Sequence, residues 1–414
     1  MCRSGSLIVD PCDQLGPPDE LDGCSAQADV EARVLREQDL VPGLESARLR
    51  SDRGHDPGPA TGLVARGDDE SGARLGLLVG GLDHDEVVER FQGEIDPAWL
   101  LQHGPNDTAA VRVGGHEVKV SNPDKPFFPE RGLTKGDLVD YYVELADSVL
   151  PHLRRRPFHM KRFTDGVAGE FFHQKRVPKG HPAYVDEVHV EFPSGHSTDF
   201  AIVDNAAALA WVVNLGCIEL HTWHSRVPDI ERPAYLLIDL DPTTDGQWPF
   251  VREIALVVRE VMDELGLGSF PKTSGATGLH ILAPIKPALL FPEVRRFAKA
   301  LAEEVERRVG DQAVATTTWR VADRVGVFVD FGQNARDRTI ASAYSIRPMP
   351  DARASAPLAW EEVPTVEPEA FTLETLPARV AKVGDLTRGM WRRKRSLVPL
   401  FERLGLDPPV SIPD

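Results

Sequence analysis

The sequence predicts an α+β fold built around a mostly antiparallel sheet. Strand-like and helix-like segments alternate after residue 111, but without the regular spacing of βαβ units that a doubly wound parallel sheet requires. The segment 270–285, FPKTSGATGLHILAPI, has the pattern of a strand, a turn and a second strand. Two further strand-like runs, YLLIDLDP at 235–242 and VGVFVDFG at 325–332, carry acidic residues inside apolar sequence. We therefore expect a sheet that carries an acidic site.

The remaining elements are predicted from apolar periodicity and turn residues. A hairpin followed by a proline-bounded loop is expected over 112–130, and Thr134 can cap a helix over 135–153. In chain order we then expect strand-like pieces at 170–172 and 185–191, helices at 206–216, 249–267 and 291–310, and a basic helix at 384–405.

Length and composition indicate a globular protein. The 414 residues suffice for one large domain or two ordinary ones, and 42% of them are hydrophobic. No apolar run approaches the ~20 residues that cross a bilayer, and the first residues lack the basic-then-apolar order of a signal peptide. None of the four cysteines forms a C-x-x-C pair. We therefore expect a cytoplasmic, disulfide-free protein without a zinc site.

The charge is distributed unevenly. The formal net charge of −17 argues at first against a nucleic-acid partner. Residues 1–105 contribute −12 of it, and the remainder has a net charge of −5. Because a nearly neutral core can bind a phosphate backbone through a local basic strip, the total charge does not exclude nucleic acid.

Composition divides the chain into three parts. Residues 1–108 are acidic, rich in Gly, Pro, Asp, Ala and Arg, and contain no Lys. This composition favours a low-order extension, with a start codon placed too far upstream or a small accessory domain as alternatives. Residues 109–350 are expected to form the main domain, and residues 351–414 a linker and a basic C-terminal helix.

Three aspartates suggest a metal site. Asp239 and Asp241 are two apart in a strand-like run, so their side chains point to one face, roughly 6.6 Å apart. Both can approach one divalent ion, or two ions that lie close together, and Pro242 ends the strand directly afterwards. An ordinary turn at a strand end is the alternative. Asp330 repeats the pattern in a second apolar strand, which strengthens the metal interpretation.

A glycine turn and two histidines are further candidates. The sequence SGATGLHI places Ser274, Gly275, Gly278 and His280 between the two acidic strands. Such a turn can bring backbone N–H groups and a hydroxyl to a phosphate, although the Gly-Lys-Ser/Thr end of a P-loop is missing and a plain hairpin turn is the alternative. His221 and His224 are spaced like ligands on a helix. His221 is the better site candidate, and His224 is better explained as a partly buried residue at a strand end.

The order of these motifs resembles that of the archaeo-eukaryotic primase superfamily. D-L-D-P, S-G-x-x-G-L-H and F-V-D-F follow one another along the chain. The segments VSNPDKPFFPERGLTKGDLVDYY, RPFHMKRFTDGVAGEFFHQK, IELHTWHSR and TIASAYSIRP resemble the polymerase domain of bacterial ligase D and its stand-alone relatives, over about residues 111–350. The resemblance implies an archaeo-eukaryotic primase fold, with an RNA-recognition-motif-like catalytic module and a smaller N-terminal subdomain.

The resemblance also implies an activity and a nucleotide site. The implied activity is a template-dependent primase-polymerase that adds ribo- or deoxynucleotides at gaps or DNA ends in break repair. Mn²⁺ or Mg²⁺ would be held by Asp239, Asp241 and Asp330. Arg347 would grip the triphosphate and His221 would lie near the ribose. The full implied nucleotide set is Ser274, Gly275, Gly278, His280, His221, Arg347 and Lys161.

For DNA, the resemblance implies that Lys125 and Lys135 bind a 5′-phosphate and that Phe171 and Phe172 stack on bases. Aromatic faces stack on any base, and a lysine is a suitable charge for a terminal phosphate. If Phe171 and Phe172 lay in a strand they would point to opposite faces, so that one would be a core residue. The two lysines could equally be ordinary surface residues.

The sequence departs from the family in two informative ways. Thr277 occupies a turn position that often carries Lys, which removes one charge from the phosphate site. The ligase nucleophile motif K-x-D-G does not occur, so ligation would require a separate ligase, and a Ku-type end-binding protein is the other partner expected. The intact aspartate set favours an enzyme over a non-catalytic module that bridges DNA ends. The Phe pair and the lysines argue against a small-molecule nucleotidyltransferase.

Overall fold

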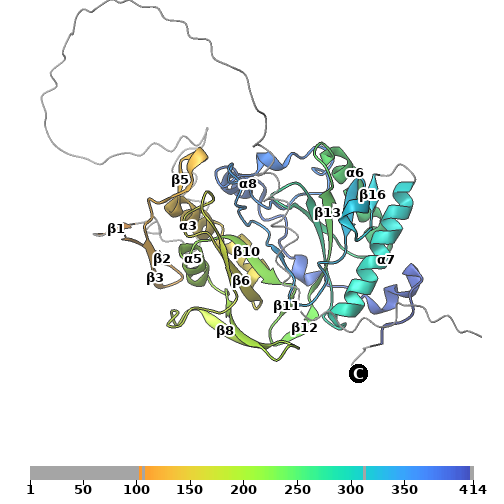
Figure 1. Cartoon of the computed structure of the whole chain (residues 1–414), viewed down its shortest axis with the longest axis horizontal. Coiled ribbons are helices and arrows are strands. Elements are labelled where there is room, and N and C mark those ends of the chain that lie inside the picture. The colour runs from red at the N-terminus through yellow and green to blue at the C-terminus, as the bar shows by residue number, and fades with distance from the viewer. Residues whose placement is uncertain (1–101, 105–107, 311–313, 411–414) are drawn as a thin grey trace, which may run out of the picture. The chain divides into compact units, whose positions relative to one another are not determined.

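The computed structural model describes residues 102–104, 108–310 and 314–410 (Figure 1). The low-order extension predicted for 1–108 lies outside these residues except at its end. There, β1 (Gln102–Gly104) pairs with β2 (Thr108–Val113), so the end of the predicted extension is a strand. Within the described ranges, no helix is long and apolar enough to span a membrane.

The first large sheet has six strands, in the order β18-β10-β6-β9-β8, and β7 pairs with β6 beside this path. Each of these pairs is antiparallel. Helices α3 and α5 contact each other, and α5 also contacts β10 of the sheet (Figure 1). The elements are α3 (Lys135–Glu144), β6 (Pro157–Arg162), β7 (Phe172–Gln174), β8 (Asp186–Glu191), β9 (Ser197–Ile202), α5 (Ala206–Asn214), β10 (Cys217–Trp223) and β18 (Thr339–Ala341).

The second large sheet has the order β14-β15-β13-β17-β16 and is antiparallel except for the β16–β17 pair. Helices α6 and α7 contact each other and both contact β13 (Figure 1). The elements are β13 (Tyr235–Pro242), α6 (Trp248–Glu264), β14 (Phe270–Thr273), β15 (Leu279–Pro284), α7 (Phe291–Val309), β16 (Ala315–Thr316) and β17 (Val327–Asp330). The predicted α+β class with mostly antiparallel sheets is confirmed.

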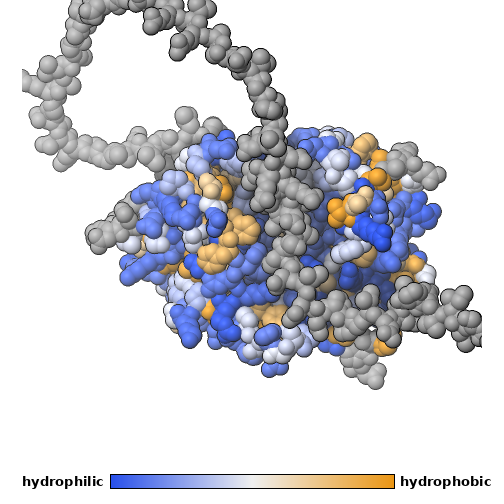
Figure 2. All heavy atoms as spheres, viewed as in Figure 1, coloured by the Kyte–Doolittle hydropathy of each residue, from blue (hydrophilic) through white to orange (hydrophobic). Residues whose placement is uncertain are grey.

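Smaller elements complete the fold. β2 also pairs with β3 (His116–Ser121), which confirms the predicted hairpin. The two-stranded ribbons are β4 (Pro126–Phe128) with β5 (Leu133–Thr134), and β11 (Ser225–Arg226) with β12 (Asp229–Pro233). Figure 2 shows a mainly hydrophilic face of the molecule, with hydrophobic residues scattered over it.

Side-chain alternation explains how β13 serves both the core and the site. Leu236, Ile238 and Leu240 belong to the main hydrophobic core, whereas Tyr235 and Leu237 belong to a separate cluster on the other face. Because successive residues of a strand point to opposite faces, the aspartates at 239 and 241 continue the face of the second cluster. The core on one side therefore fixes the direction in which both carboxylates point.

The helix predicted over 135–153 is instead two helices. Thr134 caps α3 as expected, because its hydroxyl accepts from the Asp137 N–H while the Asp137 carboxylate accepts from the Thr134 N–H. The helix ends at Glu144, and α4 (Ala146–Leu153) follows after Leu145.

The prediction of a linker and a basic helix after residue 350 is wrong. Ala354, Ala356 and Leu358 are buried in the main core, and the Thr273 N–H donates to the Ala356 carbonyl at 2.9 Å. Helix α8 (Leu376–Val383) ends where the expected helix would begin, and short 3₁₀ turns follow at Met390–Arg392, Val398–Leu400 and Glu402–Leu404. Gly389 lies inside the expected range and has positive φ, which a continuous helix does not allow.

Candidate active site

The structure brings the three aspartates together. Asp239 and Asp330 are direct partners across the antiparallel pair β13–β17, and Asp241 follows on the same face of β13. One carboxylate oxygen from each residue lies within 4.8 Å of the others. Asp239 and Asp330 are buried and Asp241 is half-buried. Three carboxylates so close together form a set of oxygen ligands suited to a hard divalent cation.

The electrostatics of this cluster favour a bound cation. Burial raises the pKa of Asp239 well above its ordinary value, and the neighbouring Asp241 and Asp330 raise it further. Burial and Asp330 raise the pKa of Asp241 to about 6. The Oδ1 atom of Asp239 is buried and makes no hydrogen bond of good geometry among the described residues, and His280 Nε2 is its neighbour at 3.3 Å. A cation would neutralise the repulsion between the carboxylates and add a ligand contact to this oxygen, so the residues present fit Mn²⁺ or Mg²⁺.

Asp330 is held in place by the chain that follows it. Its Oδ1 accepts from the Gly332 N–H at 2.5 Å, and its Oδ2 accepts from Gln333 Nε2 at 3.2 Å. A Cβ atom at Gly332 would come within 2.7 Å of the Trp319 ring and 2.9 Å of Asp330 Oδ1. Glycine therefore permits this close approach, which orients the Asp330 carboxylate.

The predicted glycine turn lies beside the aspartates. Ser274 Oγ accepts from the N–H groups of Ala276 and Gly278, so these two amides hold the turn together and are not free for a phosphate. A Cβ at Gly278 would lie 2.3 Å from the Leu240 carbonyl oxygen and 3.1 Å from Asp241 Oδ1. The absence of a side chain at Gly278 thus lets the turn approach β13 next to Asp241.

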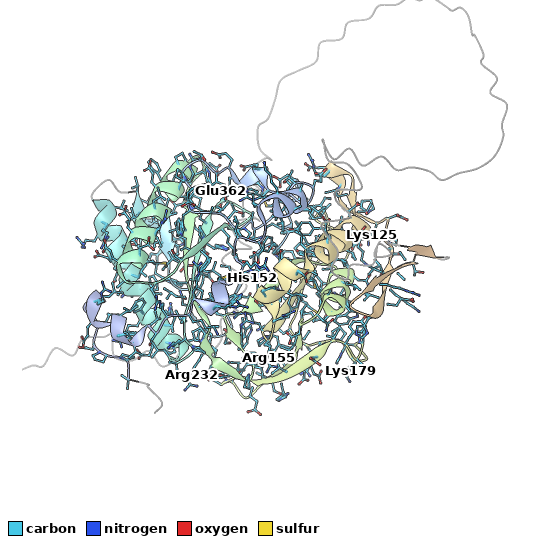
Figure 3. The ribbon with its side chains drawn as sticks, turned by 180° about the vertical axis from the view of Figure 1, so that it is seen from behind. Lys125, His152, Arg155, Lys179, Arg232 and Glu362 are labelled. Atoms are coloured by element: carbon cyan, nitrogen blue, oxygen red, sulfur yellow. The ribbon has the colours of Figure 1, made fainter. Side chains whose placement is uncertain are left out.

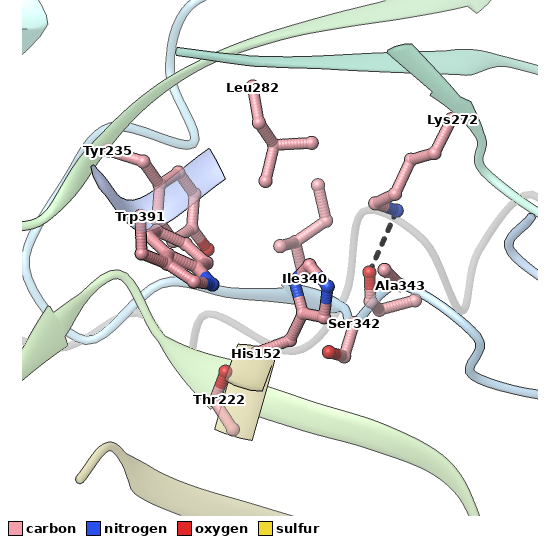
Figure 4. A pocket seen from close by; sticks show the side chains of 10 residues that line it. His152, Thr222, Tyr235, Lys272, Leu282, Ile340, Ser342, Ala343 and Trp391 are labelled. Atoms are coloured by element: carbon pink, nitrogen blue, oxygen red, sulfur yellow. Dashed lines mark hydrogen bonds between the residues drawn. The ribbon is translucent and has the colours of Figure 1, made fainter. Parts of the chain in front are cut away.

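His280 and a lysine that the sequence analysis missed lie behind Asp239. His280 is opposite Asp239 across β13–β15, and its Nε2 is 3.3 Å from Asp239 Oδ1. On the other side of the ring, Lys272 Nζ is 2.6 Å from Nδ1. Figure 4 shows Lys272 at the edge of a pocket between the two sheets, with its bond to the Ala341 carbonyl drawn. Burial, Lys272 and Arg347 hold the pKa of His280 well below its usual range, so its ring is neutral at pH 7.

A second charged cluster surrounds Glu219, which the sequence analysis also missed. Arg347 Nε lies 2.7 Å from Glu219 Oε1, and Lys161 Nζ lies 2.8 Å from Oε2. His221 Nε2 is 3.6 Å from the same Oε2. Although burial alone would raise it, the pKa of Glu219 is held well below its usual range by Arg347, His221 and Lys161. Glu219 could have been found in the sequence as an acidic residue inside an apolar strand, which is the pattern that pointed to Asp330.

The structure corrects the expectation for the histidine pair. His221 and His224 belong to an extended segment and not to a helix, and β10 ends between them at Trp223. His224 is fully buried, and its ring stacks on Tyr235 with the centroids 4.5 Å apart. His221, in contrast, lies in the Glu219 cluster.

Phe171 and Phe172 are both exposed, by 37% and 46%. The expectation that one of them is a core residue is wrong, because β7 begins only at Phe172 and the strand alternation does not include Phe171. Lys161 Nζ lies 4.3 Å from the Phe171 ring centroid, and the guanidinium of Arg162 lies 5.1 Å from that of Phe172. Each ring is therefore paired with a cation and keeps part of its surface exposed, although Phe171 also packs against Phe163 and His173.

Lys125 and Lys135 are neighbours in the fold. The Lys135 N–H donates to the Lys125 carbonyl at 2.9 Å, where the chain passes from the loop into α3 (Figure 3 labels Lys125). Lys125 Nζ contacts Asp165 Oδ1 at 2.5 Å, and the Lys135 ammonium donates to the Ser121 carbonyl at 2.7 Å. Burial, Lys125 and Arg162 lower the pKa of Lys135 to about 8. Only 5% of Lys135 is exposed, so it is not an ordinary surface lysine.

Comparisons with known proteins agree with this architecture. The family model described as "LigD, primase-polymerase domain" matches residues 134–387. The polymerase domain of Mycobacterium tuberculosis ligase D, solved in complex with DNA, aligns with a TM-score of 0.63 and 30% identity, over 67% of this chain and 99% of that one. The fold is therefore that of a ligase D polymerase domain. The chain belongs to the LigD primase-polymerase domain family.

Curated relatives support the same assignment. The multifunctional non-homologous end joining protein LigD of Pseudomonas aeruginosa is 31% identical over 308 residues, which are 73% of this chain and 36% of that protein. The bifunctional non-homologous end joining protein LigD of Bacillus subtilis is 29% identical over 271 residues, which are 65% of this chain and 43% of that protein. The aligned part thus spans 36% to 43% of the length of these two relatives.

Proposed function

We propose that this protein is a nucleotidyltransferase that extends DNA or RNA primers at gaps and broken DNA ends, on a template, in end-joining repair. The observation that carries the proposal is the convergence of Asp239, Asp241 and Asp330, within 4.8 Å of one another, in a domain of the LigD primase-polymerase family. Two-metal nucleotidyl transfer requires a carboxylate set of this kind.

The three aspartates would hold one or two Mn²⁺ or Mg²⁺ ions. When bound, such ions would neutralise the negative charge of the phosphates and activate the attacking hydroxyl group. The protein's own contribution is to position the nucleotide. Arg347 would bind the triphosphate beside the glycine turn, since its Nη1 already donates to the Ser274 carbonyl at 2.8 Å. His221 would contact the ribose, and Gly275, Gly278 and His280 shape the site around it.

DNA would be held by residues outside the aspartate cluster. The polymerase domain of M. tuberculosis ligase D was solved in complex with DNA, which supports a DNA substrate here. Phe171 and Phe172 would stack on bases, and Lys125 and Lys135 would bind a 5′-phosphate at the far side of a gap. The relatives are named as non-homologous end joining proteins, so a Ku-type protein and a separate ligase are the partners that we propose.

The test is primer extension on gapped DNA, with ribo- or deoxynucleoside triphosphates and with Mn²⁺ or Mg²⁺. We expect template-directed addition, with ribonucleotides used at least as well as deoxynucleotides, because His221 can serve as a partner for the 2′-hydroxyl. Tight binding to gapped DNA without extension under any of these conditions would instead identify a non-catalytic module that bridges ends.

A further inference from the structure

One buried carboxylate connects three of the proposed nucleotide-binding side chains. Glu219 lies in β10 and is only 1% exposed. Its Oε1 is contacted by Arg347, which follows β18, and its Oε2 by Lys161 of β6 and by His221 of β10 itself. The three partners therefore come from separate parts of the chain and meet at one group.

We propose that Glu219 is a positioning residue, which fixes Arg347, Lys161 and His221 in the arrangement that receives the triphosphate and sugar of the incoming nucleotide. This inference rests on the proposed function of the site as a nucleotidyltransferase centre. Glu219 is not required to touch the nucleotide, because it acts through the three side chains.

The physical need for such a group follows from charge and flexibility. Arg347 and Lys161 are both largely buried, with 11% and 16% of their side chains exposed, and two cations held close together repel each other. Both also have long side chains with many rotamers, which would have to be ordered when a nucleotide binds. A carboxylate that contacts both removes the repulsion and orders the side chains in advance, which lowers the cost of binding.

The arrangement continues from Glu219 to the glycine turn and to the exposed rings. Besides its contact with Glu219, Arg347 donates through Nη1 to the Ser274 carbonyl, and its Cγ would lie 2.5 Å from a Cβ at Gly275. Lys161 also lies over the Phe171 ring. The position of Glu219 therefore affects the phosphate side of the site through Arg347 and the DNA side through Lys161.

A positioning role can be distinguished from simple charge compensation. If Glu219 only offset positive charge, its removal would leave Arg347 and Lys161 freer to attract a triphosphate, and the KM for the nucleotide would fall. If Glu219 positions these side chains, the KM rises when it is removed. The KM also rises in Glu219→Asp, which keeps the charge but is one methylene too short to make the same contacts.

The experiment measures primer extension on gapped DNA, and the equilibrium binding of a fluorescent ribonucleoside triphosphate with Mn²⁺, for wild type, Glu219→Gln and Glu219→Asp. We expect the KM for the nucleotide to rise about ten- to a hundredfold in both variants, with a much smaller change in kcat. Combining Glu219→Gln with Arg347→Lys should cost less than the sum of the two effects, because the two residues act as one unit. Glu362→Gln is the matched control, since Glu362 pairs with Arg379 in the C-terminal part of the chain (Figure 3), and its KM should equal that of wild type.

Thermal unfolding shows whether each variant is folded. If Glu219→Gln does not fold, the KM of Glu219→Asp alone tests the proposal. An unchanged or lower KM in folded Glu219→Gln and Glu219→Asp, with active wild type, would overturn the positioning role alone. Wild-type protein that neither binds nor incorporates nucleotides would overturn the proposed function and this inference with it.

Discussion

Lys272 lies directly behind His280, with its Nζ 2.6 Å from the ring Nδ1, on the side of the ring away from Asp239. Lys272 is buried and also donates to the Ala341 carbonyl and the Ser355 hydroxyl, at 2.9 and 2.6 Å. Burial and Arg347 hold the pKa of Lys272 well below its usual range. In its charged form this lysine has three donors and no acceptor, so the His280 proton is then on Nε2, facing Asp239. Lys272 thereby links the β14 strand to the geometry of the aspartate cluster.

Replacing Lys272 by Met should impair both stability and activity. Two buried acceptors would lose their donor, at a cost of about 1–3 kcal/mol each, and the His280 ring would no longer be held in one tautomer. Urea unfolding and the kcat of primer extension measure the two effects. Lys299→Met, at an exposed position of α7, is the control and should change neither quantity. Wild-type stability and kcat in Lys272→Met would contradict the role described for this lysine.

Substitutions in the aspartate cluster should separate metal binding from DNA binding. Asp239→Asn and Asp241→Asn should abolish extension, while affinity for gapped DNA in a shift assay stays close to wild type. Without a divalent ion, both variants should be at least as stable as wild type, because the repulsion between the carboxylates is reduced. Added Mn²⁺ should raise the thermal unfolding midpoint of wild type only. Extension by either variant at the wild-type rate would rule out the metal site.

The preference for a 5′-phosphate should depend on pH. Burial, Lys125 and Arg162 lower the pKa of Lys135 to about 8, so its charge is present at neutral pH and is lost as the pH rises through about 8. The ratio of affinities for gapped DNA with and without the 5′-phosphate should therefore fall between about pH 7 and about pH 9.5, since the phosphate binds the charged form. Lys135→Arg should keep the preference at the higher pH, because arginine stays charged. A preference that is constant over this range would show that Lys135 does not bind the phosphate.

Removal of the exposed rings should weaken DNA binding without unfolding the protein. Stacking contributes about 1–3 kcal/mol per base, so Phe171→Ala and Phe172→Ala should each lower the affinity for gapped DNA by roughly five- to a hundredfold, whatever the sequence. Phe172 is more exposed than Phe171, so Phe172→Ala should lower the thermal unfolding midpoint less than Phe171→Ala does. Unchanged affinity in the double variant would assign both rings to another role.

Truncations should reveal the limits of the folded domain. A chain that lacks residues 1–100 keeps β1 and should fold and extend primers. A chain that ends at Pro350 loses Ala354, Ala356 and Leu358 from the core, where each buried Leu or Val contributes about 1.5–3 kcal/mol, and should be insoluble or unfolded. Soluble expression, thermal unfolding and extension assays test both. An inactive first truncation or an active second one would refute the corresponding boundary.

The parts of the fold that local pattern determines were predictable. The strand 235–242 has its predicted bounds, and helices α6 and α7 match within three residues, because each has a clear apolar period. The basic helix at 384–405 was wrongly predicted, because Gly389 adopts positive φ inside it and the chain continues in short 3₁₀ turns. Gly389 and Pro399, both unfavourable inside a helix, were the local signs of this break.

Site residues were predictable only where they lie together in one short sequence motif. Asp239 and Asp241 share a strand, so alternation alone puts them on one face. Glu219 was missed because Arg347 and Lys161 are distant from it in sequence, and its contact with Lys161 depends on the pairing of β10 with β6. The long-range register between β10 and β6 cannot be read from spacing within one segment. Lys272 was missed although it lies in the predicted strand–turn–strand segment, because the register that places it opposite His280 is set by the length of the turn.

The register between β13 and β17 also limits how the chain can change in length. A single-residue insertion in β13 ahead of Asp239 would turn the carboxylates of Asp239 and Asp241 toward the apolar core that β13 forms with α6 and α7. An insertion of two residues would restore the face but move Asp239 away from its partner Asp330. Insertions and deletions should therefore be tolerated in the loops of this domain and excluded from these two strands, whatever residue is inserted.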